Sequence, residues 1–267
     1  MREESLKEIL QKFWKMRKPV SAMLEVTTRC NLKCQFCYVS EREKKEKDLP
    51  LGKIFRIIDQ LAEAGCLEIL LLGGEPFIRK DFPEIYKYLS RKGMFIHIYS
   101  NGTLLNRKIL KTIKAYPFHY LRISLYGAKP QTYKHLSGNP RAYNMAIRGI
   151  KFAKEEGINL GLYTVLNKIN QQDASRMKKI ARQFGLGIYL QKHLTAKSDG
   201  SVKHYKLSIV KRPKRYLCHG CLFIDHTGKL TSCPVLRSSY YDLNCFSFES
   251  AWRERRDKKL KIKCPVH

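Results

Sequence analysis

Three cysteines near the start of the chain form its densest group of metal-binding side chains. Three residues separate Cys30 from Cys34, and two separate Cys34 from Cys37. Three thiolates can bind three irons of a cubane and leave the fourth iron open to a ligand. A structural zinc site needs a fourth protein ligand, and the next histidine in the chain, His97, lies 60 residues beyond Cys37. The spacing therefore favours an iron–sulfur cluster over zinc.

Short apolar runs alternate with amphipathic stretches on both sides of these cysteines. The predicted strands are residues 23–27, 67–72, 94–99, 120–125, 158–165 and 186–190, and the predicted helices are 51–64, 82–92, 107–115, 143–156 and 173–184. Alternation of this kind predicts an α/β fold with a parallel sheet and right-handed crossovers. About six such units close as a partial (β/α)6 TIM-like barrel, so ligands should lie at the carboxyl ends of the strands.

The cysteine run matches the C-x3-C-x2-C motif of the radical S-adenosylmethionine (radical SAM) superfamily. The resemblance extends from about Leu24 to Leu190, and the run Gly73-Gly74-Glu75-Pro76 follows the second predicted strand, as the family's G-G-E-P motif does. The resemblance implies a [4Fe-4S] cluster on the three cysteines and SAM as a second cofactor. It also implies which further side chains contact SAM: Phe36 at the adenine, Gly73, Gly74, Glu75 and Pro76 at the amino group, Ser100 and Asn101 near the ribose, and Ser124 at the carboxylate.

The chemistry that this resemblance implies begins with one electron passing from the reduced cluster to the sulfonium of SAM. Methionine leaves, and the 5′-deoxyadenosyl radical then abstracts a hydrogen atom from the substrate. The cofactor supplies the difficult step while the protein positions the reactants and excludes water. We expect no protein general base in generating the radical.

Five further cysteines lie in the last 50 residues. The segment from Cys218 to Cys264 resembles the twitch or SPASM-type extension of radical SAM maturases, which holds auxiliary iron–sulfur clusters. A full SPASM domain has seven cysteines, so the resemblance implies one auxiliary cluster here. The favoured ligands are Cys218, Cys221, Cys233 and Cys264. Cys245 or His267 as a ligand, and a zinc knuckle in place of the cluster, stay open.

The alternating pattern ends after His193. We predict a helical extension over residues 1–19, the core barrel over 20–193, a basic linker over 194–215 and a small auxiliary-cluster domain over 216–267. Within that last part, residues 222–225 and 229–232 are expected to form a hairpin and residues 248–260 a helix. So small a tail cannot build a core of its own, which is why we expect a metal to stabilise it.

The chain carries 52 Lys and Arg against 23 Asp and Glu, a net charge of +29. The basic residues are spread along every segment and mixed with acids, as on a solvated surface, so nucleic-acid binding is disfavoured. An acidic peptide or an acidic electron donor such as flavodoxin or ferredoxin would use the same charge. We find neither an apolar run of the roughly 20 residues that span a bilayer nor a signal peptide, and this predicts a cytoplasmic protein without membrane contact.

The leading hypothesis is a radical SAM enzyme that matures a peptide or protein by crosslinking or oxidation. The alternative is a small-molecule radical SAM enzyme, such as a GTP 3′,8-cyclase-like enzyme of molybdenum cofactor synthesis or a haem-pathway enzyme. The cyclase also has a C-x2-C pair followed by a third cysteine, but its final Gly-Gly is replaced here by Val266-His267. A basic zinc protein that binds nucleic acid is the distant alternative.

Overall fold

The computed structural model describes residues 19–41, 43–116, 120–192, 222–231, 234 and 240–257. Their strands form one sheet in the order β6-β5-β4-β3-β2-β1-β7-β8-β9. The first six strands are parallel and follow one another in chain order. They are β1 (Ser21–Thr27), β2 (Glu68–Gly73), β3 (Phe95–Ser100), β4 (Tyr120–Ser124), β5 (Leu160–Val165) and β6 (Ile188–Gln191).

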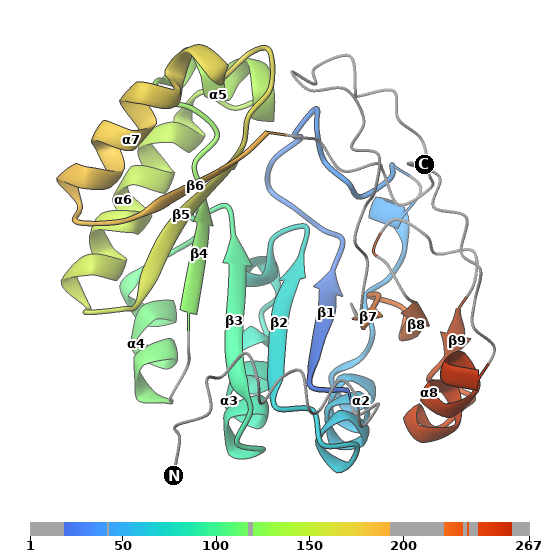
Figure 1. Cartoon of the computed structure of the whole chain (residues 1–267). Helices are drawn as coiled ribbons and strands as arrows, with labels where there is room; N and C mark the ends of the chain where they lie inside the picture. Colours follow the sequence, from blue (N-terminus) through green and yellow to red (C-terminus); the bar gives the residue numbers. More distant parts are fainter. Residues whose placement is uncertain are drawn as a thin grey trace, which may run out of the picture.

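Amphipathic helices connect consecutive strands and cover one side of this sheet (Figure 1). They are α2 (Leu51–Glu63), α3 (Phe82–Arg91), α4 (Arg107–Ala115), α5 (Pro130–Ser137), α6 (Arg141–Glu155) and α7 (Ala174–Gln183). Alternate strand residues such as Ile69, Ile96 and Leu121 are fully buried in the core cluster that the helices complete. The next residue along each strand faces the opposite side, as the strand period of two requires. The helix-free side of the sheet is therefore available to line a site.

The predicted strands and helices of the core are confirmed, each within two residues at either end. Helix α5 was not predicted. Its boundaries are nevertheless marked in the sequence, because Pro130 occupies the first turn and Gly138 ends the helix in the left-handed conformation with φ 73°. The α/β class with a parallel sheet is confirmed, and the strand arrows of β1 to β4 point to the same end of the sheet (Figure 1).

The described part of the C-terminal region joins this same sheet. Strand β7 (Phe223–Ile224) pairs in parallel with β1, and β8 (Lys229–Thr231) turns back on β7, which confirms the predicted hairpin. Strand β9 (Tyr241–Asp242), which was not predicted, pairs with β8. Helix α8 (Phe248–Asp257) confirms the predicted helix over those residues, and its first backbone N–H donates to the side chain of Gln60 on α2.

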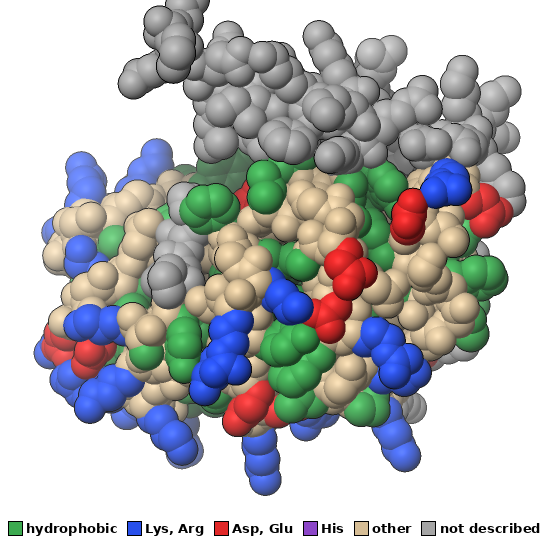
Figure 2. All heavy atoms as spheres, turned by 90° about the horizontal axis from the view of Figure 1, so that it is seen from below, with side chains coloured by type: hydrophobic (Ala, Val, Ile, Leu, Met, Phe, Trp, Pro, Cys, Tyr) green, Lys and Arg blue, Asp and Glu red, His purple; other side chains and the backbone are tan. Residues whose placement is uncertain are grey.

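Other predictions of organisation concern residues outside the described ranges. All of the helical extension predicted over residues 1–19 except Pro19 lies there, as does the linker predicted over 194–215. The proposed domain boundaries stay predictions. Among the described residues no helix is long and apolar enough to cross a membrane. Figure 2 views the molecule from below and shows Lys and Arg side chains scattered over that face with acids between them, without one continuous basic stripe.

Candidate active site

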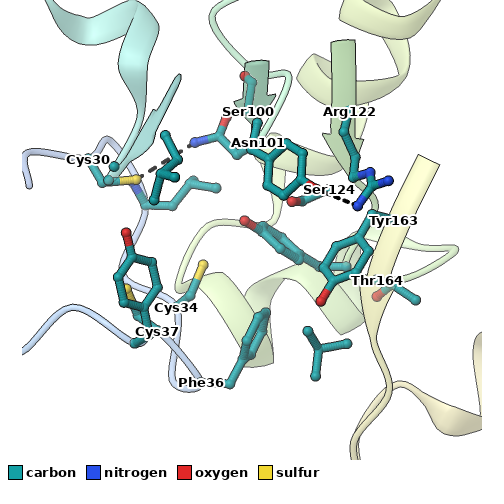
Figure 3. Close-up of a pocket in the computed structure, with 18 of the residues that line it drawn as sticks. Cys30, Cys34, Phe36, Cys37, Ser100, Asn101, Arg122, Ser124, Tyr163 and Thr164 are labelled. Atoms are coloured by element: carbon teal, nitrogen blue, oxygen red, sulfur yellow. Dashed lines mark hydrogen bonds between the residues drawn. The ribbon is translucent and has the colours of Figure 1, made fainter. Parts of the chain in front are cut away.

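A cavity of about 560 Å³ opens at the carboxyl ends of the parallel strands. The loop after β1 supplies one wall with Cys30, Cys34 and Cys37. Strands β3 to β6 supply the opposite wall, so that Cys30 and Cys34 face Arg122 and Tyr163 across the space (Figure 3). Pockets of this size enclose ligands of cofactor dimensions. The expectation that a site lies at the strand ends is therefore met by a cavity there.

The three thiols lie in a desolvated environment. Burial raises the pKa of Cys30 to about 12, and it also raises the pKa of Cys34. The charges of Cys30 and Cys37 also raise the pKa of Cys34, because the three sulfurs lie near one another. The Cys30 sulfur accepts hydrogen bonds from the Leu32 N–H at 3.4 Å and from the Asn101 amide at 3.7 Å. Such donors stabilise a sulfur that carries the charge of a thiolate.

The donor set fits a cubane better than a single ion. Among the described residues no three His, Cys, Asp or Glu side chains gather closely enough to hold one metal ion. A cubane takes one thiolate on each of three irons, so its ligands surround the cluster instead of converging on one point. Three thiols on one loop, with hydrogen bonds to a ligand sulfur, meet that requirement.

The Gly73-Gly74 pair brings the end of β2 into direct contact with the end of β1. A side chain on Gly73 would lie 2.1 Å from the Thr27 carbonyl oxygen, and one on Gly74 would lie 2.3 Å from the Arg29 carbonyl oxygen. The Gly74 N–H donates to that Thr27 oxygen at 2.8 Å. Only glycine permits this approach, and both glycines line the cavity beside the cysteine loop.

Glu75 lies behind the cavity and is fully buried. Its carboxyl group accepts hydrogen bonds from the Ser100 hydroxyl at 2.8 Å, the Asn101 N–H at 2.7 Å and the Phe77 N–H at 3.3 Å. Burial raises its pKa to about 7 even though these donors oppose the shift. In this structure Glu75 therefore holds the end of β3. The neighbouring Pro76 is also buried, and neither residue is part of the cavity lining.

A chain of side-chain hydrogen bonds joins the cysteine loop to the end of β3. The Asn101 amide donates to the Asn31 side-chain oxygen at 3.0 Å, and the Asn31 amide donates to the Thr103 hydroxyl at 2.8 Å. Thr103 in turn donates to Asn101 at 2.6 Å. These three residues fix the loop that carries Cys30 against the strand end that carries Ser100.

The remaining predicted contacts of SAM lie along the same cavity. Ser100, Asn101 and Ser124 line it at the ends of β3 and β4, and Phe36 lines it from the cysteine loop. The Phe36 ring packs edge-on against Tyr126 with 5.3 Å between ring centroids. The structure thus brings these residues together with the three cysteines, and their individual contacts with SAM stay predictions.

The family model described as the radical SAM superfamily matches residues 24–180, more than half of the chain. The chain belongs to the radical SAM superfamily. Membership implies a [4Fe-4S] cluster and SAM as cofactors, and the matched range contains the cysteine loop and the ends of β1 to β5, whereas β6 lies beyond it. The sequence-based recognition of the superfamily is therefore confirmed.

Curated radical SAM relatives differ in what they act on. The chain is 39% identical over 165 residues to the Fe-coproporphyrin III synthase of Methanosarcina barkeri, covering 61% of this chain and 41% of that protein. It is 26% identical over 195 residues to the PqqA peptide cyclase of Granulibacter bethesdensis, covering 73% of this chain and 50% of the cyclase. The chain thus spans half or less of the length of these two relatives.

A solved structure shares the fold of this radical SAM protein. Streptococcus suis SuiB bound to its precursor peptide SuiA superposes with a TM-score of 0.70 over 92% of this chain and 68% of SuiB. The sequence identity is 15%, so this likeness concerns the fold alone. The C-terminal iron–sulfur extension is a separate question, because Cys218, Cys221, Cys233 and Cys264 lie outside the described residues. Cys245 is described and exposed.

Sequence reasoning missed a buried ionic group beneath the cysteine loop. Glu25 on β1 is fully buried, accepts a hydrogen bond from the Tyr38 hydroxyl at 2.7 Å and lies 3.1 Å from the His226 ring nitrogen Nδ1. Burial opposes the charge of His226, but its pKa is raised because Glu25, Asp225 and Glu46 outweigh that effect. The available signal was a carboxylate inside an otherwise apolar strand.

The wall opposite the cysteines was missed as well. Tyr99, Arg122, Tyr163, Tyr189 and Gln191 line it from four consecutive strands. The first four residues each lie on a different predicted strand, and Gln191 lies one residue beyond the last of these strands. The family resemblance assigns a role to none of the five. Their common location follows only from the parallel register of β3 to β6.

Proposed function

We propose that this chain holds a [4Fe-4S] cluster on Cys30, Cys34 and Cys37 and cleaves SAM reductively to act on a peptide. The observation that carries the proposal is the position of these thiols on one wall of a cavity that Gly73 and Gly74 also line. When bound, the cluster supplies one electron and leaves one iron open to SAM. Superfamily membership supports both cofactors.

The protein's own part is to orient the reactants and to keep water away. Ser124 and Asn101 offer hydrogen-bonding groups at the ends of β4 and β3, and Phe36 offers an aromatic face from the cysteine loop. Glu75 holds Ser100 and Asn101 in place from behind the lining. Positioning of this kind lowers the entropic part of a reaction barrier.

A peptide substrate is supported by the PqqA peptide cyclase relative and by the fold shared with SuiB, which was solved with its precursor peptide. Crosslinking or oxidation of that peptide is the reaction we propose. The charge of +29 supports an acidic electron donor of the flavodoxin or ferredoxin kind. We also propose one auxiliary iron–sulfur cluster on Cys218, Cys221, Cys233 and Cys264, because the segment from Cys218 to Cys264 resembles the SPASM-type extension.

A second candidate function is the modification of an iron porphyrin. The 39% identity to Fe-coproporphyrin III synthase, higher than the 26% to the peptide cyclase, favours it. Both candidate functions begin with the same cleavage of SAM. They differ in the substrate, a peptide or an iron porphyrin, that would bind at the wall opposite the cysteines.

The cleavage itself is tested on anaerobically reconstituted protein. About four irons and four sulfides are expected for the radical SAM cluster, about eight with the auxiliary cluster, together with a reduced-cluster signal in electron paramagnetic resonance and 5′-deoxyadenosine after addition of SAM. Cys34→Ser should lose the SAM-dependent change of that signal and the product. The matched control is Cys66→Ser, because Cys66 is buried away from the cavity between Val20 and Glu68. Intact SAM in a fully loaded wild type would exclude the proposal.

The substrate class is tested by mass spectrometry. Reduced, loaded enzyme is incubated with SAM and either candidate precursor peptides or Fe-coproporphyrin III. A mass change in a peptide supports the first candidate, and a change confined to the porphyrin supports the second.

A further inference from the structure

Arg122 lies on the wall opposite the cysteines, at the centre of a group of tyrosines. It stands two positions before Ser124 on β4, so both side chains face the cavity. Its Nη1 donates to the Tyr99 hydroxyl, as the dashed line in Figure 3 shows. The guanidinium carbon lies 4.7 Å from the ring centroid of Tyr99, 5.7 Å from that of Tyr163 and 5.8 Å from that of Tyr120.

The charge of Arg122 has no carboxylate opposite it among the residues that the structure describes. The described lining of the cavity contains no Asp or Glu at all. The other cation of the lining, Lys44, is paired with Glu41 at 2.6 Å. Burial opposes its charge, but its pKa is raised because the hydrogen bond to Glu41 and the nearby Cys37 outweigh that effect. A guanidinium has five N–H donors, and within the described ranges only the Tyr99 hydroxyl accepts from Arg122. Donors therefore remain for a ligand.

The surrounding tyrosines hold this cation in one place. Gly161 on β5 leaves room for Tyr120. The first carbon of any side chain on Gly161 would lie 1.7 Å from the Tyr120 hydroxyl oxygen. Tyr163 donates to the Gln191 side chain on β6 and stacks on Tyr189 with 5.9 Å between centroids. Tyr189 is 61% exposed and presents an aromatic face next to Tyr163. Rings at these distances stabilise a guanidinium without neutralising it.

We propose that Arg122 binds a carboxylate of the substrate, with Tyr163 and Tyr189 packing against the part of the substrate next to it. This inference rests on the proposed function and deepens it, because it assigns the wall that faces the cluster-binding loop to an anionic substrate. A guanidinium recognises a carboxylate through two parallel N–H donors, which gives both affinity and orientation. The carboxylate has two possible sources, an acidic peptide side chain or a peripheral carboxylate of an iron porphyrin.

Two pairs of probes distinguish these sources by binding alone. The first pair is Fe-coproporphyrin III and its tetramethyl ester, titrated by absorbance. The second pair is a doubly capped pentapeptide with a central glutamate and its glutamine counterpart, titrated by calorimetry. In at least one pair the acid should bind the wild type about tenfold more tightly than the neutral form, the usual value of a charge-assisted pair. The pair in which the acid binds more tightly than the neutral form identifies the source of the carboxylate.

Three variants locate the effect. Arg122→Gln should lower the affinity for the acid to that for its neutral form, and Arg122→Lys should give an intermediate value because it keeps the charge and loses the fork. Arg148→Gln is the matched control. Arg148 is exposed on α6 and lies outside the cavity lining, so this substitution removes the same charge away from the site. Equal binding of acid and neutral probes, or a preference that survives in Arg122→Gln, overturns the proposal. So does a preference lost equally in Arg148→Gln.

SAM itself also carries a carboxylate, and its binding is measured on the same variants. The dissociation constant for SAM should change less than about threefold in Arg122→Gln. A rise of about tenfold would assign Arg122 to the methionyl carboxylate of SAM and overturn the substrate proposal. These titrations need no reductant, so their failure is distinct from a failure of SAM cleavage, which the 5′-deoxyadenosine assay reports on the wild type.

Discussion

The two walls of the cavity are built in different ways. The cysteine wall is a loop held by backbone contacts and by small polar side chains, such as the Asn31, Asn101 and Thr103 group. The tyrosine wall consists of large side chains on consecutive strands, with Arg122 among them. On the first wall the Asn31, Asn101 and Thr103 side chains hydrogen-bond to one another. On the second wall the Arg122 guanidinium has N–H donors that no described residue accepts from. This difference fits our proposal that the first wall holds the cofactor and the second binds the substrate.

Mutations should therefore affect the two walls differently. Changes behind the cysteine wall should alter both stability and the binding of SAM, since its geometry depends on close backbone contacts. Changes on the tyrosine wall should alter stability less and the binding of the acidic probe more. Three substitutions test this division.

The largest effect is expected for Gly74→Ala. The new methyl carbon would lie 2.3 Å from the Arg29 carbonyl oxygen and 2.6 Å from that of Thr28, and neither is the end of a flexible side chain. We expect a loss of about 3 kcal/mol in the free energy of unfolding, the upper end of the usual range for overpacking, together with the loss of SAM binding. Denaturant unfolding and SAM titration measure the two.

Gly52→Ala is the matched control for that substitution. Gly52 lies in α2 with open space around the position of a new methyl group. Alanine there should stabilise the protein by about 0.4–1 kcal/mol, because replacing glycine lowers the conformational entropy of the unfolded chain. Normal stability and SAM binding in Gly74→Ala would refute the close contact of the β1 and β2 ends.

Glu75→Gln is expected to have an intermediate effect that depends on pH. Burial raises the pKa of Glu75 to about 7, above its ordinary value of 4.5. At pH values between these two, the Glu75 carboxyl is therefore protonated in the folded state and ionised in the unfolded state. The wild type should therefore lose stability as pH rises from about 5 to 8, by about 3 kcal/mol relative to Glu75→Gln. At pH 5 the variant should be the less stable one, because glutamine has one acceptor oxygen for the three donors that Glu75 satisfies.

Unfolding curves at several pH values check this expectation. The control is Glu84→Gln, which changes an exposed carboxylate on α3 and should leave the pH dependence of the wild type in place. A constant difference between wild type and Glu75→Gln across this pH range would mean that Glu75 stays ionised in its buried position.

The cysteine wall was predictable because its chemistry is local in the sequence. Cys30, Cys34 and Cys37 lie within one loop. Gly73 and Gly74 are adjacent in the sequence, and both must be glycine because a side chain at either position would overlap backbone atoms. The core strands and helices followed from the alternation of short apolar runs with amphipathic stretches. Helix α5 was missed because its apolar residues are few, although Pro130 and Gly138 mark its ends.

The tyrosine wall was not predictable in this way. Tyr99, Arg122 and Tyr163 are each an ordinary polar or aromatic residue on the partly exposed side of a strand, and they meet only because the register pairs Tyr99 with Arg122 and Ser124 with Tyr163. The buried Glu25 and His226 pair joins residues 201 positions apart in the chain. Long-range pairings of this kind leave no local pattern to read.

The smallest effect is expected for Gly161→Ala on the tyrosine wall. The new methyl carbon would lie 1.7 Å from the Tyr120 hydroxyl oxygen and 2.8 Å from the ring carbon that bears it, so the ring must shift away from β5. Such a shift would change the packing of this ring beside Arg122. Because a side chain can move where a backbone cannot, we expect a loss of about 1–2 kcal/mol in stability. The acidic probe should bind several-fold more weakly, while SAM binding stays unchanged.

A double-mutant cycle with Tyr120→Phe tests the cause of that loss. Removing the hydroxyl removes the shortest contact, so Gly161→Ala should cost less in the Tyr120→Phe background than in the wild type. Gly187→Ala is the control, since Gly187 lies just before β6 with nothing within 4 Å of the added carbon and should change stability by less than about 1 kcal/mol. Equal costs in both backgrounds would mean that Gly161 does not make room for Tyr120. A loss of SAM binding in Gly161→Ala would instead show that the two walls are not independent, because the substrate wall would then also determine how the cofactor is held.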